Sequence, residues 1–207
     1  MCYAAAVAMP RRSPRPRPAR GAPEETRARL VEAAARIFNQ VGYHGTDSNR
    51  IAHAAGYAAG TFYKHFADKH EVFLEAWEAW VTAEWAAVDA ALAEGGAAHA
   101  RAARIVELVL EWHRRWRGFR ASMQALVATD AEARRVHRAQ RRRQLRLLRA
   151  LRERDGGAPR EVEDDALLLF TLERIGDAIA QGEARALGLS ERALAARLAA
   201  MVERQLG

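Results

Sequence analysis

Residues 47–66, DSNRIAHAAGYAAGTFYKHF, constrain the fold more than any other segment of the chain. They hold two helical stretches of eight residues or fewer, one on each side of Gly56, and helices this short are unstable in isolation. They therefore need a tight turn, which Gly56 can adopt, and a shared apolar core. The side chains available for that core are Ile51, Ala55, Tyr57 and Phe62. A helix-turn-helix that reads DNA and an ordinary helical hairpin both satisfy these requirements.

The remaining sequence also favours helices, because alanine, the best helix former, occupies 47 of the 207 positions while Val, Ile and Thr together occupy 23. Apolar residues recur at spacings of three and four. We expect Thr46, Asp130 and Ser190 to act as N-caps, and Asp68 to form a capping box with Glu71. About nine helices are predicted, over residues 24–41, 46–54, 58–64, 68–93, 98–116, 119–128, 130–153, 161–185 and 190–205.

The formal charge of +7 comes from 33 basic and 26 acidic residues, and most of it belongs to the first 23 residues. That segment holds five arginines and no acid, whereas residues 24–70 and 71–207 each carry a net charge of +1. Its proline-rich composition predicts a disordered basic arm over residues 1–23. The arm is a passive leader, an extension ahead of a true start at Met9, or a segment that contacts phosphates or a DNA minor groove.

Several classes of protein find no support in the sequence. No run approaches the ~18 consecutive apolar residues of a membrane span, and Cys2 is the single cysteine, which excludes an intrachain disulfide and a thiolate zinc cluster. No nucleophile–base pair, glycine-rich phosphate loop or metal-ligand spacing is found. We therefore expect a cytoplasmic protein that is not an enzyme, uses no cofactor or metal and does not bind a membrane.

A family pattern runs through residues 26–77. Its elements are, in order, Ala34, Ile37-Phe38, Gly42-Tyr43, Thr46, Ile51-Ala52, Ala55-Gly56, residues 60–66 and Lys69. This combined spacing resembles the TetR family of transcriptional regulators. The resemblance implies an all-α fold with an N-terminal three-helix DNA-binding domain at 24–70 and a larger helical ligand-binding and dimerisation domain at 71–207. Beyond residue 77 the chain resembles the family only in length, helical pattern and two long closing helices.

The resemblance implies that Thr46, Tyr63, His65 and Lys69 contact DNA phosphates, and Lys69 starts a helix, where backbone N–H groups also attract phosphate. Three departures affect this region. Ala58 stands where the family usually has a polar cap, and Ser48 replaces a usually apolar residue. In addition, Ala58, Ala59 and Gly60 offer no side-chain hydrogen bonds to base edges. Base reading is then expected from Thr61, Tyr63, Arg50 and the arm, with alanine methyl contacts to thymine. The candidate DNA-binding residues are Thr46, Arg50, Ala59, Thr61, Tyr63, Lys64, His65 and Lys69.

Four of the five tryptophans occur in two pairs, Trp77/Trp80 and Trp112/Trp116. An aromatic stripe at helical spacing is typical of an ordinary core, but indoles also line apolar pockets. The family resemblance implies a cavity for a small-molecule effector among these helices, and the aromatic lining predicts a hydrophobic one. The candidate pocket residues are Trp77, Trp80, Trp112, Trp116, Phe119, Met123, Glu107, Glu111 and His113.

Residues 167–172 place five apolar side chains in six positions, which wrap most of the circumference of a helix. Such a helix must be buried on two sides, and the second side is most simply a partner subunit of a homodimer. The family resemblance implies the same use of the last two helices. The candidate interface residues are Leu168, Leu172, Ile175, Ile179, Leu194, Leu198 and Met201.

Residues 131–154 carry ten arginines against two glutamates. A solvated helix face is the preferred interpretation, and the acidic start of the next helix, at 161–165, could neutralise part of this charge. A second DNA site and an anionic ligand such as an acyl-CoA are the alternatives.

Two functions remain open from the sequence. The leading one is a ligand-responsive transcriptional repressor that binds a palindromic double-stranded DNA operator as a homodimer and is released by a small-molecule effector. The alternative is a sequence-nonspecific basic protein of the nucleoid type, without an effector response.

Overall fold

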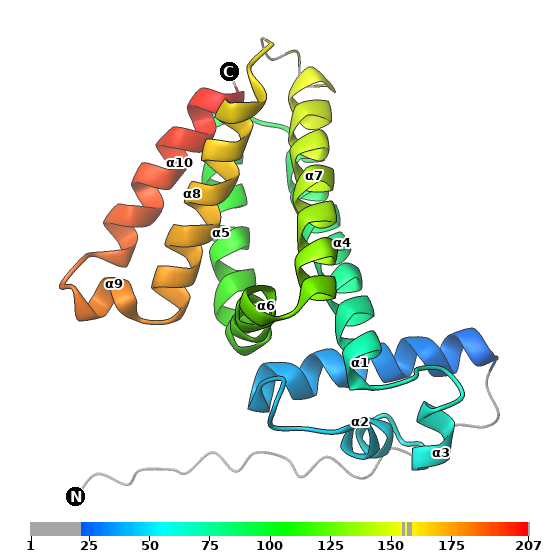
Figure 1. The fold of residues 1–207 in the computed structure, drawn as a ribbon. Helices are drawn as coiled ribbons and strands as arrows, with labels where there is room; N and C mark the ends of the chain where they lie inside the picture. Colours follow the sequence, from blue (N-terminus) through cyan, green and yellow to red (C-terminus); the bar gives the residue numbers. More distant parts are fainter. Residues whose placement is uncertain (1–21, 155, 157–158, 207) are drawn as a thin grey trace, which may run out of the picture.

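The computed structural model describes residues 22–154, 156 and 159–206, and within these ranges the chain forms ten helices and no strand (Figure 1). The all-α fold class is confirmed, whereas almost all of the predicted arm lies outside the described residues. None of the described helices is both long and apolar enough to cross a membrane. The helices are α1 (Pro23–Val41), α2 (Ser48–Ala54), α3 (Ala59–Phe62), α4 (Lys69–Ala93), α5 (Ala98–Arg115), α6 (Arg117–Thr129), α7 (Ala131–Arg154), α8 (Val162–Ala180), α9 (Glu183–Ala186) and α10 (Glu191–Leu206).

The cap of α2 differs from the prediction. The carboxylate of Asp47 accepts a hydrogen bond from the backbone N–H of Arg50 at 2.9 Å, so Asp47 is the N-cap and the assignment of this role to Thr46 is wrong. The carboxylate satisfies a backbone donor at the helix start, and Thr46 is buried instead. Ala58 gives α3 no side-chain cap, and α3 is shorter than predicted.

The other predicted N-caps are confirmed, but the carboxylate of Glu71 accepts from the backbone N–H of Ala67 at 2.7 Å and not, as in a capping box, from that of Asp68. The carboxylate of Asp68 accepts hydrogen bonds from the backbone N–H groups of His70 and Glu71 at 2.8 and 2.9 Å. The side chains of Asp130 and Ser190 accept backbone hydrogen bonds from Ala133 and Ala193 in the same way. These four-residue signals act locally, which is why the sequence alone located the starts of α4, α7 and α10.

The predicted helix over 161–185 is wrong only over its last five residues. α8 ends at Ala180, and Gly182 has a φ of +79°, a left-handed conformation that ends the helix and that other residues rarely adopt. The chain then forms the single turn of α9 before α10 begins.

Two apolar clusters hold the helices together. The first joins α1–α4 to α6 and to the start of α7, and at its centre the rings of Phe38, Phe73 and Phe119 are fully buried. The second joins the end of α4 to α5, α8 and α10. In Figure 1, α5, α8 and α10 lie on one side of the molecule, α4 and α7 on the other, and α1–α3 at the lower end of α4.

One asparagine connects α1 to the larger region. The side-chain oxygen of Asn39 accepts hydrogen bonds from the backbone N–H groups of Gly118 and Phe119, both at 3.1 Å, and its amide donates to the carbonyl of Arg115 at 2.8 Å. Asn39 therefore caps α6 from a neighbouring helix. A Cβ at Gly118 would overlap the carbonyl oxygen of Asn39, so this contact requires glycine. α4 also continues without a break across the predicted domain boundary at 70/71, and that division stays a prediction.

Candidate functional site

The helix-turn-helix candidate is built around Gly56, which has a φ of +86°. The backbone N–H of Tyr57 donates to the carbonyl of Ala52 at 2.9 Å and closes the turn between α2 and α3. Ile51, Ala52 and Phe62 are fully buried beneath it. The two short helices therefore share a rigid apolar core, as the spacing of these residues predicts.

The outer side of α3 and the turn after it carries the candidate DNA contacts. Tyr63 is 57% exposed, Lys64 and Arg50 are exposed, and Ala59, Thr61 and His65 are partly exposed. The guanidinium of Arg50 donates to the carbonyl of Gly45 at 2.6 Å, which holds it beside the start of α2. The structure thus leaves an aromatic ring, a hydroxyl and basic groups accessible on α2, on α3 and in the turn after α3.

Lys69 and Thr46 are joined where the start of α4 meets the loop before α2. The ammonium of Lys69 donates to the carbonyls of Tyr43 and Thr46 at 3.1 and 3.0 Å and lies 4.5 Å from the centre of the Tyr43 ring. Thr46 itself is 6% exposed. Lys69 therefore ties the start of α4 to the loop between α1 and α2, whatever else it contacts.

Arg27 was missed by the sequence reasoning. Its guanidinium donates to both carboxylate oxygens of Glu75 and to the backbone carbonyl of His65, and it stacks 4.1 Å from the ring centre of Phe66. It therefore connects α1, the end of the α3 turn and α4. No local motif marks it, since its partners are 38 and 48 residues away.

The predicted pocket residues do not line one cavity. Trp77, Trp80, Phe119 and Met123 are buried in the first cluster, Trp112 and Trp116 pack partly buried against it, and Glu107 and Glu111 are exposed on α5. His113 is fully buried and contacts Asp177 of α8. Trp77 and Trp80 do line a very small void of about 10 Å³ between α4, α6, α7 and α8.

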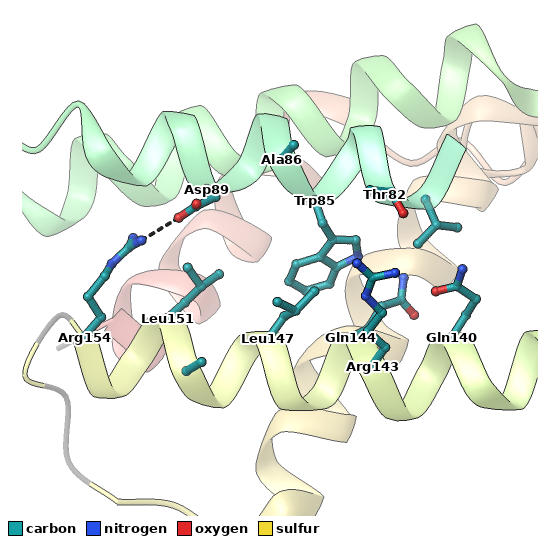
Figure 2. A pocket seen from close by; sticks show the side chains of 12 residues that line it. Thr82, Trp85, Ala86, Asp89, Gln140, Arg143, Gln144, Leu147, Leu151 and Arg154 are labelled. Carbon is teal, nitrogen blue, oxygen red and sulfur yellow. Dashed lines mark hydrogen bonds and ion pairs between the residues drawn. The ribbon is translucent and has the colours of Figure 1, made fainter. Parts of the chain in front are cut away.

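A larger cavity of about 340 Å³ lies between α4 and α7 (Figure 2), and the sequence reasoning did not find it. Its lining comes from one face of each helix, and no periodic pattern distinguishes such a face from an ordinary packed one. It adjoins the small void, since Val81, Gln140 and Gln144 line both. The other lining residues are Thr82, Trp85, Ala86, Asp89, Arg143, Leu147, Ala150, Leu151 and Arg154.

A buried polar network centred on Asp177 lies close to the small void. The carboxylate of Asp177 accepts hydrogen bonds from Arg120 at 2.7 and 3.2 Å and from Gln124 at 2.6 Å, and lies 3.0 Å from the ring nitrogen of His113. Burial alone would raise the pKa of Asp177, but the hydrogen bonds from His113 and Arg120 hold it well below its usual range. Burial lowers the pKa of His113.

Glu84 of α4 is a second buried acid in this region. Burial raises the pKa of Glu84 to about 7, although the nearby charge of Arg120 opposes the shift. Its carboxylate makes no hydrogen bond to another described residue, unlike that of Asp177. Two further acids neutralise arginines of α7, because Arg152 pairs with Asp165 and Arg141 pairs with Glu173. The expected neutralisation by the start of α8 is thus confirmed at Asp165.

The candidate interface residues face the interior of the chain. Leu168, Leu172, Ile179 and Leu198 are buried in the second cluster, and Ile175, Leu194 and Met201 pack partly buried against it. The outward face of α8 instead carries Leu167 and Phe170, which are 61% and 53% exposed. The apolar run at 167–172 predicted that α8 is buried on two sides. It did not indicate which residues face the interior of the chain and which face outward.

Comparisons with known proteins agree with the helix-turn-helix geometry of α1–α4. A family model described as bacterial regulatory proteins, tetR family, matches residues 30–76. Over 55 residues the chain is 44% identical to the HTH-type transcriptional regulator AcrR of Shigella flexneri. The matched segment is 27% of this chain and 26% of that protein. The match therefore spans about a quarter of that relative's length.

Two solved structures resemble the whole fold. One is a putative transcriptional regulator from Saccharomonospora viridis in complex with choline, with a TM-score of 0.67, 23% identity and coverage of 87% of this chain and 96% of that one. The other is the transcriptional regulator FadR from Bacillus subtilis in complex with stearoyl-CoA, with a TM-score of 0.60, 15% identity and coverage of 87% and 97%. Similarity at this level of identity concerns the fold.

Proposed function

The chain belongs, through its N-terminal region, to the tetR family of bacterial regulatory proteins, and from this premise we propose that it is a ligand-responsive transcriptional repressor. It binds a palindromic operator in double-stranded DNA as a homodimer. A small molecule bound in the larger helical region releases it from the operator.

The observation that carries this proposal is the exposed face of α3 on a fully buried support. Thr61, Tyr63 and Lys64 lie on or directly after a helix whose own anchor, Phe62, is 0% exposed. A short helix held this way can enter a major groove without rearranging. Hydrogen bonds from Thr61 and Tyr63 and the charge of Lys64 then address base edges and phosphates.

A second subunit supplies the second recognition helix. Two recognition helices must lie about 34–36 Å apart, or a multiple of that distance, to read successive major-groove faces. The outward face of α8, with Leu167 and Phe170 exposed, is the surface that supports self-association. Burial of these two side chains against a partner would remove apolar surface that the single chain leaves in water.

Release follows from the continuity of α4. This helix begins at Lys69, which is bonded to the loop before α2, and one face of its middle lines the cavity next to α7. A ligand that favours a different separation of α4 and α7 thereby changes the positions of the two recognition helices in the dimer. Coupling of about 1–3 kcal/mol between the two sites is typical of such systems. The choline and stearoyl-CoA complexes of the two structural neighbours support a ligand site in this fold.

The test uses the purified full chain and the intergenic DNA beside its gene. Footprinting should reveal protection of an inverted repeat, and Tyr63→Ala should weaken binding to that repeat. Uniform protection of any duplex, with the same affinity for a scrambled sequence, would contradict the proposal and support a sequence-nonspecific nucleoid-type protein.

A further inference from the structure

The cavity between α4 and α7 has two chemically different ends and an apolar middle. Figure 2 shows Trp85 projecting from α4 and Leu147 and Leu151 from α7 into the space between the helices. At one end Asp89 and Arg154 form an ion pair at 2.6 Å, so this end presents a matched pair of charges. At the other end lie Arg143 and the amides of Gln140 and Gln144.

At the second end several hydrogen-bonding side chains lack a partner among the described residues. Arg143 is an exposed residue and has no ion-pair partner among the described residues, and neither the amide nor the carbonyl oxygen of Gln140 makes a side-chain hydrogen bond to them. The carbonyl oxygen of Gln144 accepts from Arg141 at 3.3 Å, which leaves its amide N–H groups for another partner. A guanidinium with no acceptor is the one unpaired charge in the cavity lining.

The small void behind Gln140 and Gln144 repeats this imbalance. The indole N–H groups of Trp77 and Trp80 are buried and lack a hydrogen-bond partner within the described part of the chain. The one acid that lines this void, Glu173, is already paired with Arg141. An indole nitrogen can only donate, so what these groups lack is an acceptor. The void of about 10 Å³ is too small for the ligand itself, so the acceptor that the larger cavity lacks is one for the guanidinium of Arg143.

From this arrangement we propose that the cavity binds a small anionic amphiphile, an apolar chain that carries one carboxylate, with the carboxylate paired to Arg143. The apolar chain lies along Trp85, Leu147 and Leu151. A volume of about 340 Å³ is at the lower end of ligand cavities and suits a medium-length chain. The proposal rests on the proposed function, because it names the chemical class of the effector.

The probes are decanoate, decanol and decyltrimethylammonium, which share one chain and differ in charge. The two ionic probes are titrated below their micelle concentrations, and decanol below its solubility, into the full chain without DNA. Binding is followed by calorimetry and by quenching of tryptophan fluorescence. Decanoate should bind about tenfold more tightly than decanol, as a charge-assisted hydrogen bond provides. Tighter binding of decyltrimethylammonium, or equal binding of all three, would overturn the proposal.

Two variants locate the site. Arg143→Gln should weaken decanoate binding about tenfold and leave decanol binding unchanged, whereas the matched control Arg142→Gln changes an exposed arginine outside the lining and should alter neither. Ala86→Phe, at an exposed position of the lining, should block decanol and decanoate alike. Unchanged decanoate binding in either Arg143→Gln or Ala86→Phe would overturn the assignment of the site.

Operator binding is measured separately, so that the two proposals can fail independently. Decanoate binding that depends on Arg143 but leaves DNA affinity unchanged supports the ligand class and contradicts release by this site. Release from the operator by a compound that binds equally to the Arg143→Gln variant, with no binding of decanoate, supports the proposed function and overturns this inference.

Discussion

The N-terminal region, α1–α3 with the start of α4, and the larger helical region differ in where they keep their polar groups. In the first, the buried polar side chains are hydroxyls, Thr26, Thr46 and Ser48, and the charged groups lie at its surface. In the second, ionisable side chains are buried, among them Arg120, Asp177, Glu84, Arg152 and Asp165.

This difference matches two kinds of partner. A duplex is a large polyanion that binds from outside, so the first region needs a dry, rigid support and outward donors. A small ligand enters the protein, and a region that holds a cavity for it places polar groups in the interior. The second region should therefore be the one whose stability depends on individual buried charges and on pH.

The largest expected effect comes from the centre of the buried network. Asp177→Ala removes the shared partner of Arg120, Gln124 and His113 and leaves a guanidinium buried without its carboxylate. Unfolding by denaturant should show a loss of about 3–5 kcal/mol. Arg149→Ala, which breaks the exposed pair with Glu153, should change nothing measurable. Equal effects of the two changes would mean that the buried network is no more important than a surface pair.

A pH effect of similar size is expected from Glu84. Burial raises its pKa from an ordinary value of 4.5 to about 7, so between these values the folded chain holds a proton that the unfolded chain has released. Glu84 therefore contributes stability at low pH that is lost as the pH rises through about 7, by up to about 3 kcal/mol.

The comparison with Glu84→Gln isolates this contribution. The variant should gain stability relative to the original chain between pH 5 and pH 8, measured by denaturant unfolding at each pH. The lowered pKa of His113 acts in the opposite direction in both proteins and cancels in the difference. A difference that stays constant with pH would show that Glu84 titrates normally.

The contact between the two regions can be tested at Gly118. Gly118→Ala would force a Cβ against the backbone carbonyl of Asn39 and should cost about 1–3 kcal/mol. Gly60→Ala is the matched control, because a Cβ there meets no atom within 4 Å. Its free energy of unfolding should stay the same or increase slightly. A Gly118→Ala variant as stable as the original would mean that α1 and α6 separate easily.

The smallest effects concern the two lysines. Lys64→Met should leave stability unchanged and reduce the slope of log affinity against log salt by about one unit, since the side chain is exposed. Lys69→Met should reduce the same slope and also cost about 1 kcal/mol of stability, because its ammonium is bonded to two carbonyls. Fluorescence anisotropy on the operator and denaturant unfolding measure the two quantities. An unchanged salt slope for Lys69→Met would assign Lys69 a structural role alone.

The helix-turn-helix could be predicted from the sequence because the residues that form it lie close together in the chain. Gly56, Ile51 and Phe62 lie within twelve residues, and a turn between two short helices allows few arrangements. The cavity could not be predicted, because it depends on which faces of α4 and α7 meet. The aromatic pairs at Trp77/Trp80 and Trp112/Trp116 indicated a pocket, but most of that set packs as core.

By itself, the sequence determined the all-helical class, the caps at Asp68, Asp130 and Ser190, and the short pair of helices that resembles a family of regulators. The tertiary structure decided the partners of Asp177, the cavity and which side of α8 faces outward. The physical reason is the separation along the chain of the residues that interact. Helix starts and turns depend on neighbours a few residues away, whereas the contact of Arg120 with Asp177 joins positions 57 residues apart and exists only once the helices have packed.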